Sequence, residues 1–154
     1  KLYARTEVLV CNVEEAEKII EQNSLRGVPS GNLEGATKEF CVLLSALRAL
    51  GPKIVCITDG PKGAYMLDES GAYFIPPYPD PKPPVNRTGA GDAFASTFVS
   101  YLALGKPPLE ALRRASINSA YVVQHIGAQK GLLARDALET YLHTAPADYQ
   151  PRQI

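Results

Sequence analysis

Residues 88–92 read Thr-Gly-Ala-Gly-Asp and place two glycines and a carboxylate directly before an apolar stretch. Gly89 and Gly91 let the backbone turn tightly and leave amide groups uncovered by Cβ atoms. Amides at the start of a helix attract anions, because their N–H groups are unpaired and the helix dipole favours negative charge. The segment therefore predicts an anion site at Gly89, Ala90 and Gly91 that could stabilise a phosphate gaining charge during transfer.

Asp92 stands at the mouth of this predicted site. A carboxylate is a poor phosphate ligand because like charges repel, but it can act as a general base toward an attacking hydroxyl. The residues alone leave a structural alternative open, since Asp is a common helix N-cap and glycines often precede helices. The segment is not a Walker A loop, which needs Gly-Lys-Ser/Thr, and Phe94 replaces the third glycine of a dinucleotide fingerprint.

The elements that must position these residues follow from hydrophobic periodicity and turn signals. We expect strands at 8–11 and 54–58, helices at 13–23, 34–50, 93–104, 109–124 and 134–142, a hairpin of 63–67 and 72–75, a loop at 24–33, a proline-rich connector at 76–84 and a frayed tail from 143. This alternation favours a layered α/β fold with a mainly parallel sheet.

Composition narrows the possible classes of protein. Sixteen Lys and Arg balance sixteen Asp and Glu in 154 residues, so no basic surface for nucleic acid or for a membrane is expected. No apolar run approaches the roughly 18 residues of a membrane helix. Three cysteines in apolar segments are expected to be buried thiols of a cytoplasmic protein. Because the chain begins with Lys1, we expect it to be part of something longer.

Residues 86–94, Asn-Arg-Thr-Gly-Ala-Gly-Asp-Ala-Phe, closely resemble the second signature of the PfkB (ribokinase-like) carbohydrate kinases, D-[TR]-[TS]-G-A-G-D-x-F. Residues 10–17 resemble the family's N-x-x-E motif, and residues 57–64 resemble its T-x-G-x-x-G nucleotide turn. Residues 115–131 resemble its adenine-side helix and last loop. The resemblance covers nearly the whole chain but only the C-terminal half of a family member.

The resemblance implies a ribokinase-like three-layer α/β sandwich and an ATP- and Mg²⁺-dependent phosphotransferase acting on a sugar or nucleoside hydroxyl. By this resemblance Asp92 is the catalytic base and residues 89–91 form the anion hole. The other implied roles are Mg²⁺ binding through water by Asn12 and Glu15, nucleotide binding by Thr58, Gly60 and Gly63, adenine contact by Asn118, and closure of the nucleotide pocket by Gly127, Ala128 and Gly131. Residues 1–142 would be this catalytic half and residues 143–154 a C-terminal tail. The resemblance also allows a homodimer of the full-length protein.

Several of these residues have structural alternatives. Asn12 and Glu15 also have the spacing of a helix capping box, and Thr58 to Gly63 could be only a hairpin turn. Asn118 could be a locally bonded helix residue. Asn86 replaces the usual aspartate of the signature, which in the family helps hold a monovalent cation, so only weak K⁺ dependence is expected. A different class of function also stays open, namely a non-catalytic nucleotide-binding or interaction module without an acceptor-binding half.

Overall fold

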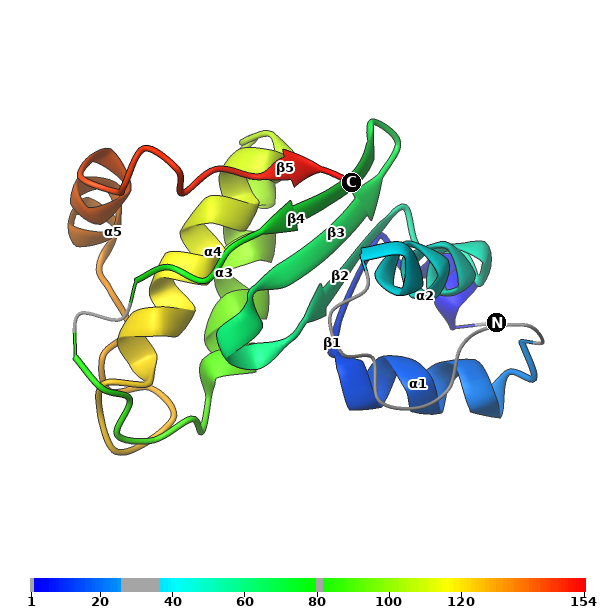
Figure 1. Ribbon diagram of the computed structural model, residues 1–154, viewed down its shortest axis with the longest axis horizontal. Helices are drawn as coiled ribbons and strands as arrows, with labels where there is room; N and C mark the ends of the chain where they lie inside the picture. The colour runs from blue at the N-terminus through cyan, green and yellow to red at the C-terminus, as the bar shows by residue number, and fades with distance from the viewer. Residues whose placement is uncertain (1, 26–36, 80–81) are drawn as a thin grey trace. The chain divides into compact units, whose positions relative to one another are not determined.

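The computed structural model of the chain describes residues 2–25, 37–79 and 82–154 (Figure 1). They form two compact units. Unit 1 comprises Lys1–Gly60, Ala64–Phe74 and Arg152–Ile154, and unit 2 comprises Pro61–Gly63 and Ile75–Pro151. Parts of the expected 24–33 loop, 34–50 helix and 76–84 connector, namely residues 26–36 and 80–81, lie outside the described residues.

The sheet has the strand order β1-β2-β3-β4-β5. Its strands are β1 (Val8–Asn12), β2 (Ile54–Thr58), β3 (Ala64–Asp68), β4 (Gly71–Ile75) and β5 (Arg152–Gln153). β1 and β2 pair in parallel, whereas β2 with β3 and β4 with β5 pair antiparallel.

The expectation of a mainly parallel sheet is therefore wrong for the described strands. A parallel connection needs a crossover of a dozen or more residues, usually a helix. The path from β1 to β2 is that long and contains two of the described helices. The path from β4 to β5 is longer still and contains three, yet β5 pairs antiparallel with β4. The chain returns from β2 to β3 through residues 59–63, and β3 is joined to β4 by the turn at Glu69 and Ser70.

Helices α1 (Val13–Gln22) and α2 (Thr37–Ala49) cover one face of the sheet in unit 1. The buried side chains of this core are Cys11, Ala16, Ile20, Phe40, Leu43, Leu44, Leu47, Val55, Ile57 and Tyr65. Phe40 stacks on Tyr65 with 3.7 Å between ring centroids. The apolar faces of these strands and helices thus pack into one layer, which holds β1 and β2 in place.

Unit 2 contains α3 (Ala90–Ala103), α4 (Pro108–Val122) and α5 (Arg135–His143). α3 and α4 pack side by side, and α5 packs against α4 (Figure 1). α3 begins three residues earlier than expected, so the glycine segment forms the first turn of the helix. No helix among the described residues is long and apolar enough to cross a membrane.

The expected frayed tail is instead ordered. Tyr149 is 2% exposed and donates a hydrogen bond from its hydroxyl to the carbonyl of Arg113 at 2.7 Å. Arg152–Gln153 form β5, which pairs with β4. Packing of the Tyr149 side chain and pairing of β5 with β4 thus order a segment whose polar, proline-containing sequence gave no sign of either.

The three cysteines are free thiols, and the expected burial is found for two of them. Cys11 and Cys56 are buried on β1 and β2, and Cys41 is half-buried on α2.

Candidate functional site

Gly89 makes the turn that starts α3. It is the N-cap residue, with φ +85°, in the left-handed region that L side chains avoid. A Cβ at this position would lie 2.6 Å from Cα of Ala128 and 2.8 Å from its Cβ. Only glycine therefore satisfies both the turn and the close approach of the loop at Ala128.

The amides of the first turn are not equivalent. The N–H of Ala90 donates to the carbonyl of Arg87 at 3.3 Å, which closes a turn. The N–H groups of Gly91 and Asp92 have no acceptor among the described residues. A Cβ at Gly91 would meet nothing within 4 Å, so the space over this turn is open. The first turn of α3 thus presents two unpaired donors to an approaching anion.

Asp92 is exposed at the third position of α3. The N-cap position belongs to Gly89 and has no side-chain capping bond, so Asp92 is not the helix cap. Its carboxylate makes no hydrogen bond or ion pair with any residue that the structure describes. The structural alternative for Asp92 therefore loses its main support.

Asn86 sets the path into the glycine turn. Its Oδ1 accepts a hydrogen bond from the N–H of Thr88 at 2.7 Å, an Asx turn. The N–H groups of Val85 and Asn86 both donate to the carbonyl of Val123, at 2.8 Å and 3.1 Å. The segment before α3 is thus held by the end of α4, and one lone pair of the Asn86 amide is already used.

Asn118 lies buried on α4 and joins three segments. Its Nδ2 donates to Oγ1 of Thr97 on α3 at 2.7 Å, and its Oδ1 accepts from the N–H of Leu133 at 2.9 Å. Both bonds are to residues distant in the sequence, so they are neither of the roles considered for Asn118 above, and its contact with adenine stays a prediction.

Ser119, next to Asn118, was missed by sequence reasoning. Its Oγ donates to the carbonyl of Ala90 in the first turn of α3 at 3.0 Å. The two residues are 29 positions apart, and a single serine in a helix carries no motif that would mark the contact.

The loop after α4 depends on two further glycines. Gly127 has φ +104° and open space where a side chain would begin, whereas Gly131 has φ +106° and crowded surroundings. A Cβ at Gly131 would lie 2.8 Å from the carbonyl oxygen of Tyr121 and 3.1 Å from Cε1 of His125. Gly131 thus lets the loop fold back on α4. Ala128, between the two glycines, touches Gly89, so two motifs predicted separately meet in unit 2.

The remaining predicted residues lie mostly in unit 1. Asn12 and Glu15 form the capping box: Oδ1 of Asn12 accepts from the N–H of Glu15, and Oε2 of Glu15 accepts from the N–H of Asn12, both at 2.9 Å. Asn12 is in register with Thr58, so the carboxyl ends of the two parallel strands bring these residues together. Gly60 follows with φ +51° and open space around it.

Gly63, by contrast, belongs to unit 2 and is buried, with φ +113°. No cluster of three or more His, Cys, Asp or Glu side chains that could bind a metal directly occurs within residues 2–25, 37–79 and 82–154.

These features define an α/β protein with polar groups at the ends of parallel strands and a glycine-started helix suited to phosphate. The chain belongs to the pfkB family of carbohydrate kinases, whose family model matches residues 1–135. Over 99 residues it is 37% identical to the ribokinase of Bacillus subtilis, covering 64% of this chain and 33% of that protein.

Solved structures show the same fold. The ribokinase of Thermotoga maritima has a TM-score of 0.73 and 26% identity, over 92% of this chain and 44% of that chain. The Arabidopsis thaliana ribokinase, solved with ribose and ATP, has a TM-score of 0.76 and 25% identity, over 92% and 42%. The ribokinase-like α/β fold is therefore confirmed, and this chain spans less than half the length of these relatives.

Proposed function

We propose that this chain is the nucleotide-binding and catalytic part of an ATP-dependent kinase that phosphorylates a hydroxyl of a sugar or nucleoside. The observation that carries the proposal is the first turn of α3. It presents the unpaired N–H groups of Gly91 and Asp92 beside open space, and the exposed Asp92 carboxylate lies on the same turn. The Arabidopsis thaliana ribokinase was solved with ribose and ATP, which agrees with this substrate class.

In the proposed reaction the acceptor oxygen bonds to the γ-phosphorus of ATP, and the bond from that phosphorus to the bridging oxygen of ADP breaks. The hydroxyl proton passes to a carboxylate oxygen of Asp92. The unpaired N–H groups of Gly91 and Asp92 stabilise negative charge on the transferred group, because they are fixed and need no reorganisation. Placing the base and the donors on one helical turn keeps the base beside the group that it activates.

Mg²⁺, when bound, would neutralise phosphate charge. Asn12 and Glu15 fit an indirect, water-mediated role, because the capping box fixes an exposed carboxylate at the end of β1. We assign phosphate contacts to Thr58 and Gly60. At Asn86, a neutral amide oxygen favours K⁺ less than a carboxylate would.

The test of the proposed function is Asp92→Asn in the full-length product of this reading frame, measured by ADP release across sugars and nucleosides. We expect a loss of rate of about 10²- to 10⁴-fold, the usual size of a general-base effect. Asp136→Asn is the matched control, since Asp136 is an exposed aspartate in the first turn of α5. An unchanged rate in Asp92→Asn would show that Asp92 is not the base, and nucleotide binding without turnover would favour the non-catalytic module.

A further inference from the structure

The first turn of α3 is held at two points by α4 and the loop that follows it. Ala128 lies against Gly89, where no side chain would fit. Ser119 Oγ donates to the carbonyl oxygen of Ala90 at 3.0 Å. The carbonyl of Ala90 and the N–H of Gly91 belong to the same peptide group, so Ser119 acts directly on a peptide that faces the open space.

A hydrogen bond at one end of a peptide group changes the other end. When the carbonyl oxygen accepts a hydrogen bond, the peptide group becomes more polarised and its N–H becomes a stronger donor. Condensed-phase estimates put the strengthening at about 10–30% per hydrogen bond. The bond also fixes the plane of the peptide and therefore the direction of the N–H. The N–H of Gly91 has no acceptor among the described residues, so both effects remain available to a ligand.

We infer that Ser119 is a positioning residue for the phosphate site, which orients and strengthens the Gly91 amide through the carbonyl of Ala90. This inference rests on the proposed function, because it assigns the Gly91 amide to the terminal phosphate of ATP. The hydroxyl of Ser119, on α4 and outside the glycine segment, thus joins the residues that set the affinity for that phosphate.

The experiment compares Ser119→Ala, Ser119→Thr and Ser116→Ala in the full-length protein by ¹⁵N NMR titration with a non-hydrolysable ATP analogue and with ADP, each with Mg²⁺. Threonine keeps the hydroxyl, and Ser116 is a buried serine one turn earlier on the same helix. We expect Ser119→Ala to weaken binding of the triphosphate analogue by about two- to five-fold, with ADP affinity changed less than about two-fold. In the ligand-free protein, the Gly91 amide resonance should shift in Ser119→Ala and return toward its wild-type position in Ser119→Thr.

The outcomes separate this inference from the proposed function. Equal loss of affinity for both nucleotides, no recovery in Ser119→Thr, or the same effect in Ser116→Ala would overturn the role of Ser119 alone. A wild-type full-length protein that binds neither nucleotide would overturn the proposed function, and the assignment of Ser119 to the phosphate site with it.

Discussion

At the scale of single residues, Gly89 and Gly91 have different requirements although they belong to one motif. Gly89 combines φ +85° with contact to Ala128, whereas Gly91 lies inside a helical turn with open space around it. We expect Gly89→Ala to lower the free energy of unfolding by about 2–4 kcal/mol, because the left-handed backbone and the clash both cost energy.

Gly91→Ala is the matched control and should leave stability unchanged or raise it by about 0.5–1 kcal/mol, since alanine favours the helix. Urea denaturation of the two variants beside wild type measures the difference. Equal stability losses in both would contradict the contact between Gly89 and Ala128.

Sequence reasoning at this scale succeeded where the partners are close along the chain. The capping box of Asn12 and Glu15 spans three positions, and the structure confirms it. It could not find the contacts of Asn118 and Ser119, because their partners Leu133, Thr97 and Ala90 come from other elements. Helical propensity carries no information about which distant polar group the side chain of a helix residue will bond.

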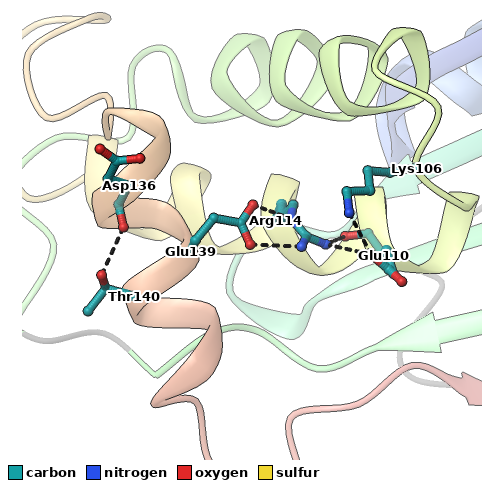
Figure 2. Close-up of polar contacts among 6 residues, drawn as sticks. All are labelled: Lys106, Glu110, Arg114, Asp136, Glu139 and Thr140. Atoms are coloured by element: carbon teal, nitrogen blue, oxygen red, sulfur yellow. Dashed lines mark hydrogen bonds and ion pairs between the residues drawn. The ribbon is translucent and has the colours of Figure 1, made fainter.

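At the scale of elements, Arg114 ties α4 to α5 (Figure 2). Its guanidinium donates to both carboxylate oxygens of Glu139 at 2.8 Å and to the backbone carbonyl of Glu110 at 3.0 Å. It also lies over the ring of Tyr101 on α3, 5.0 Å from the centroid. Arg114 is only 6% exposed, so losing its carboxylate partner would leave a buried charge poorly compensated.

We therefore expect Glu139→Gln to lower the free energy of unfolding by about 1–3 kcal/mol near neutral pH, less than for a fully buried pair because Glu139 is partly exposed. Hydrogen bonds from Arg114 lower the pKa of Glu139 below its ordinary 4.5. The stabilisation is thus present above pH 4.5 and is lost as the pH falls through the lowered pKa. The loss of stability over this pH range should therefore be smaller in Glu139→Gln than in the wild-type protein.

Lys106→Ala supplies the control for this pair. Lys106 lies 3.9 Å from Glu110 in an exposed ion pair, which should contribute less than about 0.5 kcal/mol. Urea denaturation at neutral and acid pH compares the two variants. A Glu139→Gln protein as stable as Lys106→Ala at every pH would show that Arg114 does not depend on Glu139.

Element positions were more predictable than element directions. Among the residues that the structure describes, both hairpin strands and the five α-helices were expected within a few residues of their observed bounds. The direction of pairing was wrong for β2 with β3 because the connection between them is too short for a parallel crossover. It was wrong for β4 with β5 because a long connection permits either direction, and strand composition does not decide between them. Burial of Tyr149 could not be foreseen either, since its partner is the carbonyl of Arg113, 36 positions away.

At the scale of the whole molecule, the chain aligns with only 42–44% of the solved ribokinases, although it contains the proposed base and phosphate site. Positioning of the acceptor supplies much of the rate of phosphoryl transfer. We expect the 154-residue chain alone to bind nucleotide weakly and to transfer phosphate at least about 10²-fold more slowly than the full-length protein. ADP release measured on both proteins, with Asp92→Asn as background, tests this, and an equal rate on any sugar would refute it.

The burial of two cysteines in the sheet has a practical consequence for labelling. Burial, with a smaller effect of Glu15, raises the pKa of Cys11 to about 12, and burial also raises the pKa of Cys56. Because the thiolate is the reacting species, both should resist alkylation in the folded protein. Half-buried Cys41 on α2 is then the natural attachment point for a probe.

Iodoacetamide at about pH 8 should therefore add one group to the folded chain and three after unfolding, counted by mass spectrometry. Two or more additions to the folded chain would contradict this. A fluorophore at Cys41 would report on unit 1 without any engineered cysteine.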